Sequence, residues 1–283
     1  MAYLRPTALA EFSNDHNGQL ALSRNLHMLL KYLIVYNINA WISSVVFVRH
    51  RDCSRGKLMD VWYTTAKAIV RAYLTLFVDR IHVLGQREIP PGPKIIIANH
   101  TNVTDSFIVP FLVKEKVHFM IQSETFTLPV IGRMLALADQ IPVYVGQGQA
   151  ALDAALERLK LGHAVAIFPE GRLNDGKTFH RAGAGATVLA LESGVPVIPL
   201  GFYVPDENAR PIKSHFFNRL TIGRWQFGGG CFVEIGEPWR ISNTVGDRFN
   251  YREIRRITEN LMARVAELVQ QAQDEARRLG MMK

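Results

Sequence analysis

The distribution of hydrophobic and polar positions divides the chain into two parts. Residues 1–19 are polar, whereas residues 28–48 and 58–79 are mainly apolar over lengths typical of helices. From residue 81 onward, short runs rich in β-branched residues alternate with segments of helical periodicity. This alternation predicts an α/β domain over residues 81–283, with a largely parallel central sheet flanked by helices. A helical part over residues 1–80 is expected to precede it.

The periodicity within the second part predicts its individual elements. Strand-like runs bounded by turn residues lie at residues 95–98, 117–121, 141–145, 164–168, 195–204 and 232–235. Helical periodicity is found at residues 150–161, 183–192 and 251–279. A glycine cluster at residues 227–230 lacks the surroundings of a phosphate-binding loop, so we expect a turn there.

The two apolar stretches of the first part predict a membrane-associating helical hairpin. Trp41 and Trp62 lie within them, and Lys31 makes a complete membrane span less favourable. The turn between the stretches is basic, with Arg49, His50, Arg51, Arg55 and Lys57. Aromatic helices joined by cations suit a hairpin embedded among anionic head groups of the cytoplasmic leaflet. A pair of ordinary core helices and a single transmembrane span are the two alternatives.

The composition favours a protein that works at a lipid surface. The chain has 283 residues, of which 48% are hydrophobic, and a net charge of +8 that attracts anionic partners. It has no zinc-finger spacing and no RNA-binding aromatic signature, so we favour a membrane lipid surface over nucleic acid. Cys53 and Cys231 have no metal-ligand spacing and indicate a reduced compartment. These features predict monotopic or peripheral attachment to the cytoplasmic face of a membrane.

The segment Asn99-His100-Thr101-Asn102-Val103-Thr104-Asp105 carries the first chemical signal. It follows the strand-like run at residues 95–98, and a helix is expected to begin near Asp105. A histidine at the end of a strand can meet an aspartate at the start of the next helix. The carboxylate would bond one ring N–H and leave the other ring nitrogen free as a base. We therefore expect His100 and Asp105 to remove a proton from an alcohol, although this spacing alone is common by chance.

Two later segments make the interpretation specific. Phe168-Pro169-Glu170-Gly171-Arg172 follows one strand-like run, and Val195-Pro196-Val197-Ile198-Pro199-Leu200 lies one helix further on. Together, and in this order, the three segments resemble the glycerol-phosphate and 1-acylglycerol-3-phosphate (lysophosphatidic acid) acyltransferase family. The resemblance extends from about Ile81 to about Trp239.

The resemblance implies an O-acyltransferase that needs no cofactor. The fatty acyl group would come from a thioester, either acyl-CoA or acyl-carrier protein, and pass directly to a lipid hydroxyl. The preferred acceptor is 1-acylglycerol-3-phosphate, which would give phosphatidic acid. His100 would be the base and Asp105 its orienting group, while Glu170 and Gly171 would shape the acceptor pocket and Arg172 would meet the head group. The absence of a Gly-x-Ser-x-Gly elbow agrees with direct transfer.

The segment between the two motifs departs from the family pattern. Residues 122–126 and 129, together with Gly132 and Arg133, resemble the acceptor-binding region. The family commonly has a lysine where this chain has Gln122, and an acidic-basic pair at the positions of Tyr144 and Val145. A different acceptor, such as a lysophospholipid, a glycolipid or an amino-acid lipid, therefore stays open. A membrane-associated scaffold without catalytic activity is the alternative from another class.

Overall fold

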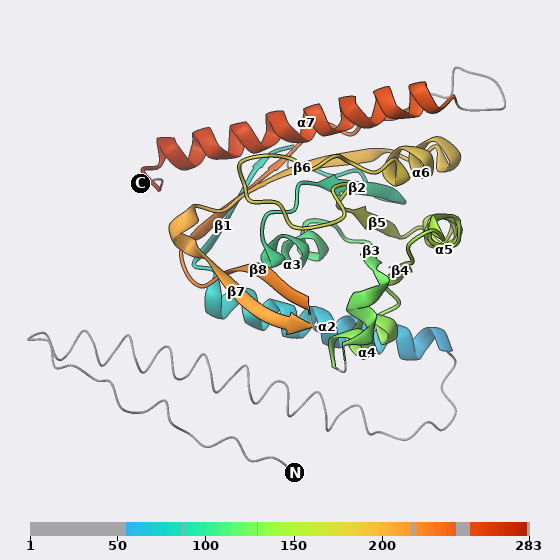
Figure 1. Cartoon of the computed structure of the whole chain (residues 1–283), viewed down its shortest axis with the longest axis horizontal. Helices are drawn as coiled ribbons and strands as arrows, with labels where there is room; N and C mark the ends of the chain where they lie inside the picture. Colours follow the sequence, from blue (N-terminus) through green and yellow to red (C-terminus); the bar gives the residue numbers. More distant parts are fainter. Residues whose placement is uncertain (1–54, 87, 129, 217–218, 242–249, 282–283) are drawn as a thin grey trace, which may run out of the picture. The chain divides into compact units, whose positions relative to one another are not determined.

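The chain divides into two compact units, Met1–Arg51 and Asp52–Lys283. The computed structural model describes residues 55–86, 88–128, 130–216, 219–241 and 250–281, all within the second unit (Figure 1). The first apolar stretch, residues 28–48, lies outside the described residues, so the predicted hairpin and the domain boundary after residue 80 remain predictions. Among the helices that the structure describes, none is both long enough and apolar enough to cross a membrane.

A seven-stranded sheet forms the centre of the second unit. Its strands are β1 (Arg80–Gly85), β2 (Lys94–Ala98), β3 (Val117–Gln122), β4 (Ile141–Val143), β5 (Ala164–Ile167), β6 (Val197–Tyr203) and β9 (Gly230–Ile235). The strand order is β1-β9-β6-β2-β5-β3-β4, and every neighbouring pair is parallel except β6 with β9. The prediction of a largely parallel sheet is confirmed.

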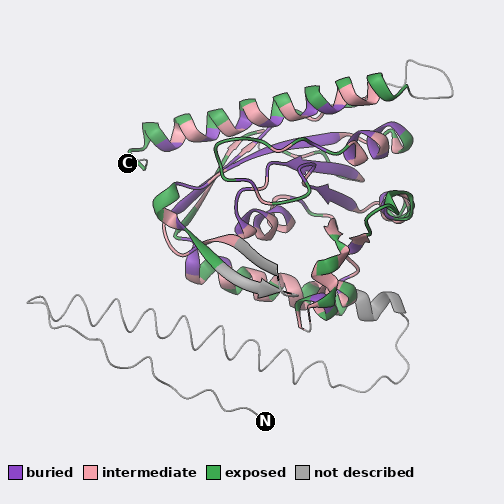
Figure 2. Cartoon of the chain, in the orientation of Figure 1, coloured by how far each residue is buried: buried purple, intermediate pink, exposed green. Residues whose placement is uncertain are grey.

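Helices cover both faces of this sheet. The helices α2 (Arg55–Phe77) and α3 (Val103–Leu112) lie on one face, and α5 (Gly148–Lys160), α6 (Gly185–Ser193) and α7 (Tyr251–Arg278) lie on the other (Figure 1). Ile95 and Ile97 pack with the second group, whereas Ile96 and Ala98 pack with the first. Successive strand residues point to opposite faces, so this apolar run is buried completely. Along α7, buried positions face the sheet and exposed positions face away (Figure 2).

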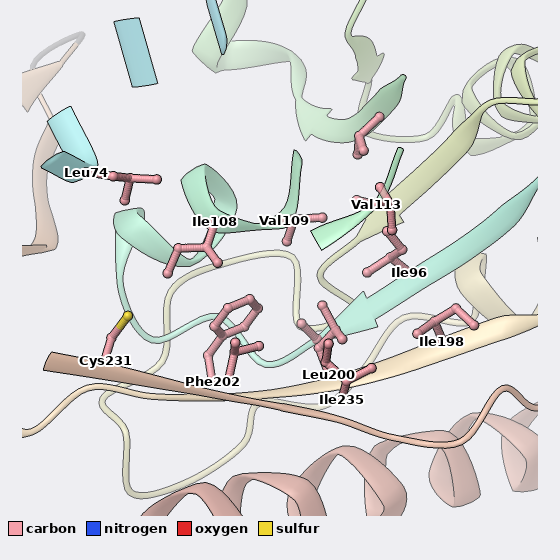
Figure 3. Packing of buried hydrophobic residues seen from close by; sticks show 14 of the residues in the cluster. Leu74, Ile96, Ile108, Val109, Val113, Ile198, Leu200, Phe202, Cys231 and Ile235 are labelled. Carbon is pink, nitrogen blue, oxygen red and sulfur yellow. The ribbon is translucent and has the colours of Figure 1, made fainter. Parts of the chain in front are cut away.

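The face under α3 holds the larger part of the core. Ile108 and Val109 of α3 pack against Ile96, Leu200 and Phe202 of the sheet (Figure 3). The carboxyl-terminal end of α2 joins this cluster through Leu74, and Val78, which directly follows the helix, belongs to the same cluster. The second apolar stretch is therefore a core helix at this end, as one of the two alternatives to a membrane hairpin requires.

The remaining elements were not predicted from the sequence. They are η1 (Ser123–Thr127), α4 (Ile131–Leu137), η2 (Asp206–Asn208), and the antiparallel strands β7 (Ala209–Phe216) and β8 (Arg219–Gln226). Trp225 in β8 makes edge-to-face contacts with Tyr73 of α2 and Phe107 of α3. These two contacts attach the β7–β8 hairpin to α2 and α3.

A cluster of titratable side chains occupies the amino-terminal ends of β3 and β5. His118 is fully buried, and its Nδ1 lies 2.7 Å from the carbonyl oxygen of Asp139 while its Nε2 lies 2.9 Å from Nδ1 of His163. Arg158 donates two hydrogen bonds to the Asp139 carboxylate, at 2.8 and 2.9 Å. Burial lowers the pKa of His118 from its ordinary 6.5 to about 4, and burial also lowers the pKa of His163.

This cluster predicts a loss of stability in acid. In the unfolded chain His118 takes up its proton near pH 6.5, whereas in the folded protein it does so only near pH 4. The unfolded state therefore binds more protons between these values, and the free energy of unfolding should fall as the pH falls from 6.5 towards 4. Urea unfolding of the wild type and of His118→Asn measures the effect. The variant should show a flatter pH dependence, and parallel curves for the two proteins would contradict the prediction.

Candidate active site

The two sequence motifs meet at the carboxyl edge of the sheet. β2 and β5 are adjacent and parallel, with Ile97 paired to Ile167, so the segments that follow them leave the sheet at the same edge. The chain continues from β2 into α3 on one face and from β5 into α6 on the other. In open α/β sheets, ligands bind outside the carboxyl ends of neighbouring strands whose following segments pass to opposite faces of the sheet.

His100 and Asp105 are brought together as the sequence predicts. Asp105 lies in the first turn of α3 and is fully buried, and its Oδ2 lies 3.6 Å from Nδ1 of His100. The same oxygen accepts hydrogen bonds from the backbone N–H groups of Thr101 (2.8 Å) and Asn102 (2.7 Å). These two backbone bonds fix the carboxylate at the start of α3, where it faces His100. The 3.6 Å separation exceeds a hydrogen bond, which is common for catalytic pairs without substrate.

The two ring nitrogens of His100 differ in their surroundings: Nδ1 is buried, and Nε2 is free to bond a substrate. Its Nδ1 is buried on the side of Asp105. Phe168 stacks on the ring with the centroids 4.0 Å apart and the planes at 14°. Within the described part of the chain, Nε2 has no hydrogen-bond partner, and the side chain is 19% exposed. A carboxylate beside Nδ1 favours the hydrogen on that nitrogen and leaves Nε2 able to accept a proton.

Glu170 connects the two motifs. It is 7% exposed. Its Oε1 accepts hydrogen bonds from the backbone N–H of His100 (3.2 Å) and from Nδ2 of Asn174 (2.7 Å). Its Oε2 accepts a hydrogen bond from the backbone N–H of His180 at 2.7 Å. Asn174 and His180 were not identified from the sequence, because polar residues of a loop follow no periodicity.

The segment after Glu170 is exposed and basic. Gly171 has a φ of +68°, a backbone conformation that favours glycine and turns the chain towards solvent. The guanidinium of the exposed Arg172 lies 3.3 Å from Nδ1 of His180, and no carboxylate pairs with it among the described residues. Gln122 at the end of β3 donates a hydrogen bond to the carbonyl oxygen of Gly171 at 2.8 Å. The residue that replaces the expected lysine therefore holds the glycine turn in place.

Gly132 and Arg133 lie in α4. A Cβ atom at Gly132 would overlap the backbone carbonyl of Phe126, so glycine is needed there for α4 to pack against η1. Arg133 is exposed and, within the described residues, makes no hydrogen bond or ion pair with the segments around His100 and Glu170. The packing of α4 against η1 therefore explains the glycine at position 132, and the side chain of Arg133 is exposed to solvent.

The described residues provide no metal site and no accessible cysteine nucleophile. In the described ranges no three His, Cys, Asp or Glu side chains are grouped as metal ligands. Cys231 is fully buried in β9, and burial together with the nearby charge of Asp105 raises the pKa of its thiol far above the usual range. This thiol is therefore protonated and out of reach of a substrate.

Comparisons with known protein sequences give a consistent result. A sequence model of the family described as Acyltransferase matches residues 80–203. The chain is 30% identical over 125 residues to a 1-acyl-sn-glycerol-3-phosphate acyltransferase of Pseudomonas aeruginosa, with 43% of this chain and 48% of the relative covered. It is 29% identical over 164 residues to a lyso-ornithine lipid O-acyltransferase of the same species, with 53% and 61% covered. The chain thus spans less than two thirds of the length of either relative.

A solved structure shares the fold. The crystal structure of the 1-acyl-sn-glycerophosphate (LPA) acyltransferase from Thermotoga maritima superimposes with a TM-score of 0.58 at 23% sequence identity. The match covers 88% of this chain and 97% of the other. At this level of identity the similarity shows the arrangement of sheet and helices, and it supports the α/β architecture described above.

Proposed function

We propose that the chain is an acyltransferase that transfers a fatty acyl group from an acyl thioester to a lipid hydroxyl, as the match of residues 80–203 to the Acyltransferase family model supports. The acceptor is 1-acylglycerol-3-phosphate, and the product is phosphatidic acid in phospholipid biosynthesis. The observation that carries this proposal is the His100–Asp105 pair beside the Glu170 loop, at the carboxyl edge of two adjacent strands. The donor is acyl-CoA or acyl-carrier protein, and no further cofactor takes part.

The chemistry needs one base. The acceptor hydroxyl attacks the thioester carbonyl carbon while Nε2 of His100 takes the hydroxyl proton. The resulting tetrahedral intermediate collapses with cleavage of the carbon–sulfur bond, and the imidazolium returns the proton to the leaving thiolate. The buried carboxylate of Asp105 stabilises the positive ring during this interval.

The acceptor phosphate binds the basic segment after Glu170. Arg172 has no competing carboxylate among the described residues, and a guanidinium can contact two phosphate oxygens at once. Gly171 provides the turn that presents this side chain, and the exposed Arg133 supplies a further cation. Residues 1–80 attach the enzyme to the lipid surface on the cytoplasmic face, in a monotopic or peripheral manner. The substrates are lipids and thioesters, and nucleic acid has no role.

A second acceptor class is favoured by two observations. One relative is named as an acyltransferase of lyso-ornithine lipid, and Gln122 stands where the resemblance expects a cation. In the structure the side chain of Gln122 is engaged with the Gly171 carbonyl, which is a neutral contact within the loop. An amino-acid lipid with a free hydroxyl would need fewer cations than a phosphate. The chemistry at His100 would be the same.

A panel of acceptors decides between these assignments. The purified full-length chain is incubated with acyl-CoA or acyl-carrier protein and with 1-acylglycerol-3-phosphate, lysophospholipids, a glycolipid or lyso-ornithine lipid. Products are identified by mass spectrometry. We expect phosphatidic acid as the main product, and His100→Ala prepared in parallel controls for contaminating activity. Turnover of lyso-ornithine lipid alone would replace the acceptor assignment, and no acylation of any acceptor would reject the proposed function.

A further inference from the structure

We infer that Glu170 is a positioning residue that holds His100 in place for catalysis and makes no contact with the acceptor. The inference rests on the proposed function, since it assigns a role within the same site. It differs from the role that the sequence motif suggests, in which Glu170 shapes the acceptor pocket.

The carboxylate of Glu170 is already occupied by its own chain. Three donors from different segments point at it, namely the backbone N–H of His100, Nδ2 of Asn174 and the backbone N–H of His180. Three of its roughly four acceptor positions are filled and 7% of the residue is exposed, so a substrate group that bonded these oxygens would have to crowd or displace a donor. A displaced buried N–H would cost free energy. An anionic head group would also be repelled by the carboxylate.

Asn174 completes the arrangement around the backbone of His100. Its own backbone N–H donates to the carbonyl oxygen of His100 at 2.7 Å, while its side chain donates to Glu170. Asn174 is itself buried, with 6% of its surface exposed. Both polar backbone groups of His100 are therefore bonded to the loop that follows β5: the N–H to Glu170 and the carbonyl to Asn174.

This arrangement fixes the base more completely than the Asp105 contact alone. The ring is oriented by Asp105 and Phe168, and the backbone is fixed by Glu170 and Asn174. Proton transfer depends steeply on geometry, and a displacement of about 1 Å can cost on the order of 10²-fold in rate. Loss of the Glu170 contacts should therefore appear in kcat rather than in the affinity for the acceptor.

The test separates kcat from KM in matched variants of the full-length chain. In Glu170→Gln one oxygen becomes an NH₂ group, which then faces at least one of the present N–H donors. We expect kcat to fall by about 10- to 100-fold, with the acceptor KM within about twofold of the wild type. Arg172→Lys is the reference for a head-group contact and should raise the acceptor KM. Glu157→Gln, which removes the same charge from an exposed position (71% exposed), should leave both constants unchanged.

A second variant keeps the test decisive if Glu170→Gln does not fold or changes both constants. Asn174→Ala removes the side-chain bond to Glu170 without altering charge, and its buried position keeps it from the acceptor. It also removes the bonds that Oδ1 of Asn174 accepts from the backbone N–H of Gly176 (2.7 Å) and from Oγ1 of Thr101 (3.4 Å). It should lower kcat several-fold at an unchanged acceptor KM, with a thermal melt confirming that the variant is folded. In the double variant the two losses should be less than additive, because both act through His100.

Opposite results would overturn the inference. These are a Glu170→Gln variant whose only change is a raised acceptor KM, wild-type constants in Glu170→Gln, or wild-type kcat in Asn174→Ala. The measurement uses whichever acceptor of the panel the wild type acylates. If that acceptor carries no phosphate, the phosphatidic acid assignment fails while the ratio of kcat values still tests Glu170.

Discussion

Replacement of His100 by alanine is expected to lower kcat by roughly 10²–10⁴-fold, because proton transfer by a positioned base contributes about this much. The side chain is only 19% exposed, and its contacts are the stacking on Phe168 and the approach to Asp105. Its removal leaves the backbone bonds to Glu170 and Asn174 intact. We therefore expect the fold to be retained. Steady-state kinetics with both substrates, together with a thermal melt, measures the two effects.

The control for this variant is His100→Gln, which keeps a polar side chain but cannot shuttle a proton. It should be about as inactive as the alanine variant. The mechanism would be wrong if either variant turned over at the wild-type rate. A loss confined to KM would also contradict it, because a base acts mainly in the chemical step.

The second large effect is expected for Asp105→Asn. Oδ2 of Asp105 accepts two backbone N–H groups and faces Nδ1 of His100, so the oxygen of an asparagine side chain should take this place. The loop and the ring orientation would then be kept while the negative charge is lost. In the proposed mechanism the charge stabilises the imidazolium during transfer, so kcat should fall by about 10²-fold or more.

Kinetics and stability together distinguish this explanation from a structural one. Asp105→Asn should melt close to the wild-type temperature, whereas Asp105→Leu should lose stability as well, because two buried backbone N–H groups lose their acceptor. An Asp105→Asn variant with nearly full kcat would show that the carboxylate acts only on the loop. The role assigned to its charge would then be wrong.

The sequence predicts the buried strands of this fold and the edge strand β4 well, but it predicts the edge strand β1 and the β7–β8 hairpin poorly. The run at 95–98 is fully buried, and its continuous β-branched pattern is typical of a central parallel strand. β1 consists only of exposed and half-buried residues in no regular order and includes Arg80 and His82, so no clear pattern marks it as a strand. The β7–β8 hairpin is a separate two-stranded sheet, and Pro211 and Gly223 interrupt its strand signal.

The motifs predict which residues form the candidate site, but they do not predict which way the side chains point. The spacing of His100 and Asp105 implies that they meet, and the structure places them 3.6 Å apart. The motif around Glu170 marks this residue as important without indicating whether the carboxylate points to solvent or to the chain. The direction of the carboxylate depends on Asn174 and His180, because the loop after β5 places a hydrogen-bond donor from each of them beside Glu170. No local sequence pattern predicts that a loop will bring these donors to Glu170.

The loop after β5 combines ends that are bonded to the site with an exposed middle. Glu170 and Asn174 hold its first part against His100, and Glu170 also holds the backbone at His180. The residues between them, 175–179, are exposed. Sequence changes in this stretch can therefore alter what the loop presents to a lipid head group without moving the base. Under the proposed function, such an arrangement makes acceptor preference and acyl-transfer chemistry separately adjustable within one loop.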